Sequence, residues 1–299
     1  MTNFAWDDLQ FFLAVARAGQ LSRAARQLRT SHVTVSRRVD RLEQSLKLRL
    51  FERNPRGYEL TSHGRRLLAS AERMEAESQK LEEAISGEAE AQRGVVRVAM
   101  PEGFAHFFTT RLLVDFTTQF PNIAPELVAL PQVMSLSRRE ADLSVTLDPF
   151  RASTYSSAQL CPYKLRLYGA RDYLASHPPI TNRDRLQEHR FIGYIEEMIF
   201  APGLDYLHEV HANVRAQIKS SSVFNQITAV RDGLGLAVLP SYVARAHDDL
   251  VEVLGQEVVI QRAYWINCHR DSLQSPRERA IMAFLREGVA RHAGILAAD

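Results

Sequence analysis

The sequence predicts two fold classes in one chain: a mainly α-helical winged helix-turn-helix, then a long linker helix, then an α/β domain. Residues 21–43 have the pattern of two short helices around a polar break. Residues 62–88 repeat apolar residues in steps of three and four, and strand-like and helical runs alternate from about residue 94 onward. With 299 residues the chain is long enough for at least two domains.

Residues 21–43, LSRAARQLRTSHVTVSRRVDRLE, predict the helix-turn-helix. Val35, Val39 and Leu42 form one apolar stripe of a helix that begins near Ser31 and ends around Leu46. Small side chains at Ala24 and Ala25 let the preceding helix pack closely on it. Hydroxyls and guanidiniums remain for the outer face, and they suit phosphates and base edges. These outward candidates are Ser31, His32, Thr34, Ser36, Arg37, Arg38 and Arg41.

The flanking residues complete a winged domain. An apolar face predicts a helix from Asp7 to Ala18, and Gly19 ends it. After the second helix-turn-helix helix, two short strand-like pieces surround the turn Asn54-Pro55-Arg56-Gly57, which is typical of a β-wing. Arg53 and Arg56 on this wing are expected to reach a phosphate or the minor groove.

Charge is unevenly distributed along the chain. Residues 1–66 hold 13 Lys and Arg against 6 Asp and Glu, whereas the remaining residues hold 24 against 29. A net charge of +7 at one end and −5 in the rest predicts a nucleic-acid-binding domain joined to a body with another task. Twelve of the 13 cations are arginine, which favours bidentate contacts.

Residues 62–88 predict one long helix with a narrow apolar stripe. Such a helix is marginal alone in water and needs a partner, either its own copy or the body of the protein. We favour a homodimer. The predicted dimerisation residues are Leu67, Ala71, Met74, Ser78, Leu81 and Ile85.

From residue 94 the alternation of strands and helices predicts a mainly parallel sheet covered by helices. The expected strands are 95–100, 124–130, 142–147, 164–169, 236–240 and 263–268, and the expected helices are 104–120, 135–140, 222–232, 240–246 and 275–290. Crossing strands near residues 162 and 267 would join two halves and leave a cleft between them.

Composition and motifs exclude several classes. The chain is 45% hydrophobic and 24% charged, without an apolar run near the roughly 18 residues of a membrane span or a signal-peptide pattern at its start, so we expect a cytoplasmic protein with no membrane partner. The sequence contains no common catalytic motif, and we predict no enzyme activity, catalytic residue, cofactor or metal site. His208 and His211 could pair on a metal, but a solvated helix face explains them better.

The N-terminal motifs resemble those of LysR-type transcriptional regulators. The matching positions are Ala24-Ala25, Leu28, Ser31, Val35, Ser36, Val39, Leu42-Glu43, Leu50-Phe51-Glu52-Arg53, and Leu60-Thr61 with Gly64. Further on, Arg231 to Arg245 resembles the family's glycine-rich segment, and Ser275 to Leu285 resembles its C-terminal helix.

The resemblance implies a DNA-binding domain over 1–61, a linker and dimerisation helix over 62–90, and a bilobed, periplasmic-binding-protein-like effector domain over 91–299. Its first subdomain would span about 94–162 and 268–299, and its second about 163–267. It implies regulation of transcription at operator or promoter DNA by a homodimer or a tetramer of two dimers. The resemblance also allows a contact with RNA polymerase.

The resemblance also places effector contacts in the cleft. The residues at those positions are Glu102, Gly103, Phe104, Asp148, Pro149, Tyr194, Phe200, Ser221 and Ser222. A helix N-terminus after Pro101 favours a carboxylate or aromatic effector. Against a carboxylate, Glu102 and Asp148 would repel an anion, or would bind an amine or hydroxyl group.

Four positions depart from the family pattern. His32, Val33 and Lys47 replace the usual glutamine, proline and glycine, and Gly103 stands where a hydroxyl residue is common. His32 and Val33 lie where base edges are read, since imidazole can bond a base and valine can pack on a thymine methyl. We therefore expect an altered operator preference.

One alternative stays open within the regulator class, namely redox sensing through Cys161 and Cys268. Their separation of 107 residues excludes a CxxC motif. A free cysteine is more often a small buried hydrophobe, although the neighbours of Cys268 could lower its pKa.

Overall fold

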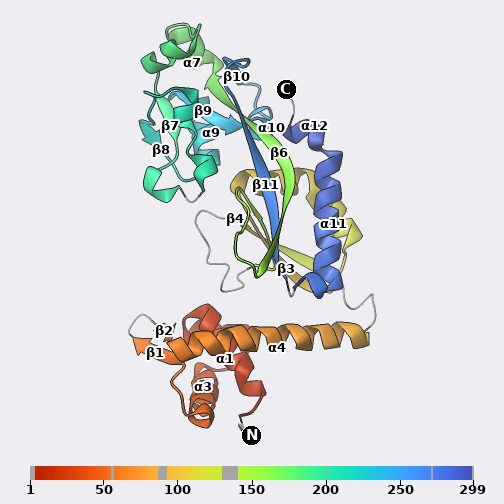
Figure 1. Ribbon diagram of the computed structural model, residues 1–299. Coiled ribbons are helices and arrows are strands. Elements are labelled where there is room, and N and C mark those ends of the chain that lie inside the picture. Colours follow the sequence, from red (N-terminus) through yellow and green to blue (C-terminus); the bar gives the residue numbers. More distant parts are fainter. Residues whose placement is uncertain are drawn as a thin grey trace. The chain divides into compact units, whose positions relative to one another are not determined.

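The computed structural model describes residues 4–54, 57–86, 93–129, 141–199, 201–270 and 272–297, without the side chains of residues 76, 79–86 and 274. These residues belong to two compact units, one that includes the long linker helix and one that begins after it (Figure 1). No helix in these described stretches is long and apolar enough to cross a membrane.

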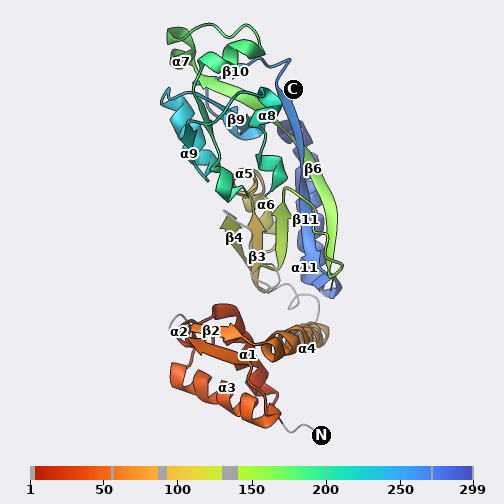
Figure 2. The same cartoon turned by 60° about the vertical axis from the view of Figure 1, so that its left-hand side comes forward.

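The N-terminal unit is a winged helix-turn-helix, as predicted. Its elements are α1 Asp7–Ala18, α2 Leu21–Gln27, α3 His32–Leu46, β1 Phe51–Asn54, β2 Gly57–Leu60 and α4 Ser62–Ser86. Gly19 ends α1 in the left-handed conformation with φ 66°, and α2 begins one residue before Ser22. Ala24, Ala25, Val35, Val39 and Leu42 are all buried in one core with Phe12 of α1. Figure 2 shows the antiparallel wing beside α1 and α2.

Glu43 ties α3 to the wing. Its side chain is 5% exposed, and its carboxylate accepts the backbone N–H of Leu50 at 2.6 Å and of Phe51 at 3.1 Å. Arg49 and Arg53 pair with the same carboxylate at 3.2 and 3.4 Å. A buried carboxylate is stable only with such partners. The glutamate of the Leu42-Glu43 motif therefore has a structural role, because it joins α3 to the wing.

The Leu-Thr motif with Gly64 marks the join between wing and linker helix. Thr61 donates its hydroxyl to the Arg49 carbonyl at 2.8 Å and accepts the Gly64 N–H at 3.0 Å, which caps α4. A Cβ atom on Gly64 would lie 2.1 Å from the Leu50 carbonyl oxygen. Only glycine allows the helix to approach the start of β1 this closely.

The first half of α4 packs on its own unit. Ala71 is 1% exposed, and Leu67 and Met74 pack against the core that contains α1. Arg17 of α1 donates to both carboxylate oxygens of Glu75 at 3.1 and 2.5 Å. The first part of the apolar stripe therefore packs on its own chain. The sequence analysis assigned these residues, Leu67, Ala71 and Met74, to dimerisation.

The described residues of the C-terminal unit form an α/β fold on one nine-stranded sheet. Its strands are β3 Gly94–Met100, β4 Ile123–Ala129, β5 Leu143–Thr146, β6 Tyr155–Ala170, β7 Phe191–Gly193, β8 Ile218–Lys219, β9 Leu236–Pro240, β10 Leu250–Val253 and β11 Val259–His269. Its main helices are α5 Glu102–Phe107, continued by a π-helical turn Phe108–Leu112 into α6 Leu113–Gln119, then α7 Arg171–Ser176, α8 Leu207–Val210, α9 Val223–Arg231, α10 Ser241–Ala244, α11 Pro276–Arg291 and α12 Ala293–Leu296. Short 3-10 turns span Arg183–Glu188, Glu196–Met198, Pro202–Leu204 and Ser272–Gln274.

The sheet is mixed, so the expectation of a mainly parallel sheet was wrong. The strand order is β4-β3-β5-β11-β6-β9-β7-β8, and β10 also pairs with β6. The outer strands run parallel within each half, but β6 and β11 are antiparallel to each other and to β9 and β5 respectively. Alternation of strands and helices predicts parallel strands only within each half. The two long strands cross between the halves in opposite directions, and their pairings are therefore antiparallel.

The β6–β11 ladder joins the two halves of this unit (Figure 1). It pairs eleven residues of β11 with β6, including Ala263 with Pro162, so the predicted crossings near residues 162 and 267 lie on it. The register shifts where Tyr264 pairs with Cys161 and Trp265 with Gln159, which leaves Leu160 as an extra residue of β6.

The other predicted segments can be located in the same unit. The strand at 236–240 has the predicted bounds, and those at 164–169 and 263–268 are parts of the longer β6 and β11. The helix at 104–120 is interrupted by the π-helical turn. The helix expected over 135–140 lies outside the described residues.

We predict that Glu43→Ala lowers the free energy of unfolding of the N-terminal unit by about 3 kcal/mol, because two buried N–H groups lose their acceptor. Glu43→Gln keeps an oxygen for these N–H groups and should cost about 1 kcal/mol. Urea denaturation followed by circular dichroism measures both. Equal losses in the two variants would contradict this role of the carboxylate.

Candidate nucleic-acid interface and ligand cavity

Helix α3 presents a polar, exposed N-terminal end. Ser31 is its N-cap, since its hydroxyl oxygen accepts the Thr34 N–H at 3.1 Å and lies 2.9 Å from the Thr34 hydroxyl. His32, Val33 and Arg37 are exposed, and Val33 is 63% exposed although it is apolar. The first turn of α3 therefore offers an imidazole, an isopropyl group and hydroxyls at one end of the domain.

Asp8 of α1 binds two of the predicted DNA-contacting arginines. Its side chain is 1% exposed, and Arg41 donates Nε and Nη2 to its two carboxylate oxygens at 2.6 and 2.5 Å. Arg38 donates to the same carboxylate at 3.1 Å and lies over the Phe11 ring at 5.3 Å from the ring centre. Arg38 and Arg41 are 30% and 51% exposed, so both are anchored at one side and open to solvent at the other.

The wing arginine is anchored in the same way. Arg53 pairs with Asp40 of α3 and with Glu43, and its guanidinium lies 5.4 Å from the centre of the Tyr58 ring. Arg56 lies outside the described residues. Ser36 is half-buried and donates to Asp40 at 3.4 Å. Beside the wing, His32, Ser22, Asn54 and Tyr58 are among the residues that border an open hollow.

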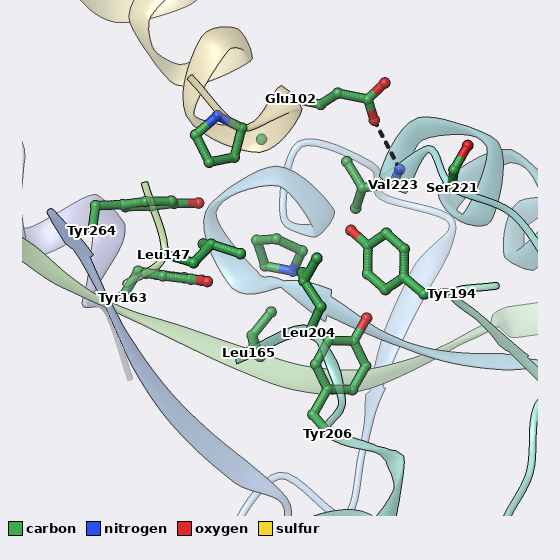
Figure 3. A pocket seen from close by; sticks show the side chains of 13 residues that line it. Glu102, Leu147, Tyr163, Leu165, Tyr194, Leu204, Tyr206, Ser221, Val223 and Tyr264 are labelled. Atoms are coloured by element: carbon green, nitrogen blue, oxygen red, sulfur yellow. Dashed lines mark hydrogen bonds between the residues drawn. The ribbon is translucent and has the colours of Figure 1, made fainter. Parts of the chain in front are cut away.

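The C-terminal unit contains a narrow cavity of about 40 Å³ beside the β6–β11 ladder (Figure 3). This volume accommodates about three water molecules. Helices α5 and α9, strands β6, β9 and β11 and the segment 194–206 supply its walls. The lining residues are Pro101, Glu102, Gly103, Leu147, Tyr163, Leu165, Tyr194, Leu204, Tyr206, Ser221, Val223, Pro240 and Tyr264.

A hydrogen bond joins two helices at the wall of this cavity. Glu102, in the first turn of α5, accepts the backbone N–H of Val223, the first residue of α9, at 2.9 Å (Figure 3). Ser222 caps α9 by accepting the Asn225 N–H at 3.4 Å. The N-terminus of α9 is therefore already bonded to a carboxylate of the protein itself.

Tyrosine hydroxyls provide most of the other polar groups. Figure 3 shows the hydroxyls of Tyr163, Tyr194, Tyr206 and Tyr264 pointing toward the cavity. Tyr206 donates to the Val238 carbonyl at 3.1 Å, and the Tyr264 hydroxyl lies 2.7 Å from that of Tyr242. Burial raises the pKa of each, and the negative charge of Glu102 raises the pKa of Tyr194 further, so these phenols stay neutral at physiological pH.

Gly103 makes room for the tyrosine pair. A Cβ atom on it would lie 2.9 Å from the Tyr242 hydroxyl oxygen and 3.7 Å from that of Tyr264. The hydroxyl expected from the family at this position is absent, and two phenol hydroxyls occupy the adjacent space instead.

Only part of the predicted effector set meets at this cavity. Glu102, Gly103, Tyr194 and Ser221 line it. Phe104 is fully buried beneath it, with its ring centre 4.9 Å from that of Tyr264. Among the other predicted residues, Asp148, Pro149 and Ser222 are not part of the lining: Asp148 and Pro149 are exposed, and Ser222 caps α9. Phe200 falls outside the described residues.

The sequence analysis missed Tyr163, Tyr206 and Tyr264. Tyr163 had a usable signal, because Cys161, Tyr163, Leu165 and Leu167 alternate along β6, the pattern of side chains on one face of a strand. Tyr264 faces the same space from the paired strand, and its ring stacks on that of Tyr163 at 4.2 Å. No local pattern marked Tyr206.

The two cysteines are separate and buried. Cys161 pairs with Tyr264, and Cys268 lies four residues farther along β11, opposite Ser156. Four strand residues span roughly 13 Å, whereas a disulfide needs Cα atoms within about 7 Å of each other. Cys161 and Cys268 are 5% and 1% exposed, and burial raises the pKa of Cys161 to about 12.

Each of the two units matches a known protein family. Residues 6–65 match the model of bacterial regulatory helix-turn-helix proteins of the lysR family, and residues 89–290 match that of the LysR substrate binding domain. The chain belongs to the LysR family. It is a LysR-type DNA-binding transcriptional regulator with an effector-binding domain, and the resemblance seen in its motifs is confirmed.

Named regulators and solved structures match nearly the full length of this chain. The transcriptional regulator PtxR of Pseudomonas aeruginosa is 28% identical over 293 residues, covering 95% of this chain and 92% of PtxR. Among solved structures, a full-length cysteine variant of OxyR from P. aeruginosa has a TM-score of 0.74 at 18% identity, covering 96% of this chain and 98% of OxyR. LysG of Corynebacterium glutamicum, solved with bound effector Arg, has a TM-score of 0.66 at 17% identity, with coverages of 96% and 98%.

We predict that neither cysteine of the native LysR-type regulator reacts with a thiol reagent between pH 7 and 9. Raising the pKa of Cys161 from 9.0 to about 12 lowers its thiolate population in this range. Unfolding in urea returns the ordinary pKa, and both thiols should then react. Titration with a coloured disulfide reagent measures this, and rapid modification of the folded protein that also changed DNA binding would restore the redox alternative.

Proposed function

We propose that this regulator binds operator DNA through α3 and the wing, and that a small molecule in the cavity beside β6 and β11 changes that binding. The observation that carries the DNA-binding part is the capped, exposed N-terminal end of α3, with His32, Val33 and Arg37 open to solvent. A helix placed in this way can enter the major groove with its first turn.

The proposed contacts divide into two groups. Arg37, Arg38, Arg41, Arg53 and Arg56 bind phosphates, and Ser31, His32, Val33, Thr34 and Ser36 lie on the side of the base edges. Arg41 and Arg38 keep one side on Asp8, so they position the helix as well as binding DNA. Ser31 and Thr34 also hold the cap, which leaves His32 and Val33 as the freer base-reading side chains.

The proposed effector is a small molecule, and the cavity argues against the carboxylate alternative, because the charged group of its described lining is the carboxylate of Glu102. The tyrosine rings suit stacking with an aromatic group, the other alternative, but a volume of about 40 Å³ is too small for a whole ring. We also propose that the regulator responds to this molecule, that it acts in the cytoplasm, and that it contacts RNA polymerase.

We further propose that the chain acts as a dimer or a tetramer of two dimers. Leu67, Ala71 and Met74 pack on α1, so the later part of α4, with Ser78, Leu81 and Ile85, is the better candidate for self-association. Ser78 is exposed, and the side chains of Leu81 and Ile85 lie outside those that the structure describes.

Arg37→Ala should weaken DNA binding and reduce the slope of log affinity against log salt by about one unit, because one phosphate contact is lost. Fluorescence anisotropy with labelled operator DNA at several salt concentrations measures the slope. Arg185→Ala is the matched control, since Arg185 is an exposed arginine of the other unit that pairs with Glu188. An unchanged slope for Arg37→Ala would contradict the assigned face.

Leu81→Asp combined with Ile85→Asp should shift the chain toward monomer, because two charges would enter an apolar helix seam. Sedimentation velocity distinguishes one chain from two or four. Arg66→Glu, an exposed position of the same helix, controls for charge change alone. An unchanged mass for the double variant would place the interface elsewhere.

A further inference from the structure

The cavity of the C-terminal unit has a distinctive charge. Of its described lining residues, Glu102 carries a formal charge, and none carries a positive one. Resting on the proposed function of this cavity as the effector site, we infer that Glu102 makes it select a small organic cation, a primary ammonium compound, and reject carboxylates.

The first reason is that the helix N-terminus facing the cavity is already occupied. The Glu102 carboxylate bonds the Val223 N–H at 2.9 Å, at the position where a ligand carboxylate would meet α9. A ligand carboxylate would have to displace Glu102 and would leave two like charges in one narrow cavity, which is costly. An ammonium group displaces nothing, because a carboxylate can keep the Val223 bond and accept further hydrogen bonds.

The second reason is the supply of acceptors. An ammonium group has three N–H donors and no acceptor. Tyr206 uses its hydrogen on the Val238 carbonyl, so its oxygen lone pairs remain acceptors, and the Tyr242–Tyr264 pair likewise retains oxygen lone pairs. Tyrosine rings add the attraction of a cation for aromatic faces. Burial raises the pKa of Tyr194, and the negative charge of Glu102 raises it further, in the direction that also favours a cation beside these groups.

The third reason concerns size. A cavity of about 40 Å³ takes an ammonium head and few carbons. Tyr194, Leu204 and Tyr206 also line a neighbouring cavity of about 530 Å³, whose other walls combine Ile199, Leu207 and Val214 with the charged residues Glu196, Asp205 and Arg215. A chain longer than the first cavity therefore meets space of mixed polarity on the far side of these three residues.

The test uses full-length protein at pH 7 and three probes of similar length that differ in charge: n-butylammonium, butyrate and 1-butanol. We expect n-butylammonium to raise the melting temperature with concentration. By calorimetry it should bind at least about tenfold more tightly than butyrate, the effect of a charge-assisted hydrogen bond. Glu102→Gln keeps an oxygen for the Val223 N–H but removes the charge, so the preference for n-butylammonium should fall by about tenfold or more.

The controls separate this inference from the proposed function. Glu188→Gln removes a surface carboxylate that pairs with Arg185, and it should leave the preference unchanged. Equal or tighter binding of butyrate, a preference that survives in Glu102→Gln, or binding of none of the three probes would overturn the inference. Operator binding measured on the same samples is a separate readout. Butyrate that bound more tightly than n-butylammonium and shifted operator affinity would support the effector site while excluding the cation.

Discussion

The antiparallel ladder between β6 and β11 is the interaction on which the C-terminal unit depends. Each half of the sheet contributes parallel strands, but β5 attaches only to β3 and β11, and β9 only to β6 and β7 among the described strands. The two long strands therefore hold both halves in one sheet. They also position the cavity, because Tyr163 and Leu165 of β6 and Tyr264 of β11 project into it.

Two buried carboxylates have the corresponding role in the winged helix unit. Asp8 joins α1 to α3 through Arg38 and Arg41, and Glu43 joins α3 to the wing through two backbone N–H groups. A buried charge is tolerated only when its partners are held in place, so these contacts fix the reading helix relative to its neighbours. Arg38 and Arg41 thus contribute to the basic surface and also hold α3 in position.

The sequence predicted the elements of the winged helix and most of the body strands, because apolar periodicity, a serine cap and turn glycines are local signals. The role of Asp8 could not be predicted, since nothing local shows that two arginines about thirty residues away will enclose it. Leu67, Ala71 and Met74 of the stripe on α4 pack on the core that contains α1, but spacing could not tell whether the partner was α1 or a second chain. The direction of β6 and β11 likewise depended on long-range pairing.

The cavity was the least predictable part for a related reason. Four residues that the resemblance assigned to the effector, Glu102, Gly103, Tyr194 and Ser221, line this cavity, because these positions follow the ends of strands or begin helices. It did not indicate that Glu102 would bond the opposite helix, since that contact joins residues 121 positions apart. Tyr163 and Tyr264 came from the middle of the crossing strands, where the pattern is that of a buried core. Tyr206 precedes α8, outside any strand.

The extra residue in β6 at Leu160 has a mechanical consequence. A bulge interrupts the hydrogen-bond ladder and increases local twist, so it is a compliant point in an otherwise continuous pair of strands. Tyr264 lies at this interruption and also at the cavity wall. A side-chain displacement at Tyr264 would therefore act where the ladder that both halves share is already interrupted.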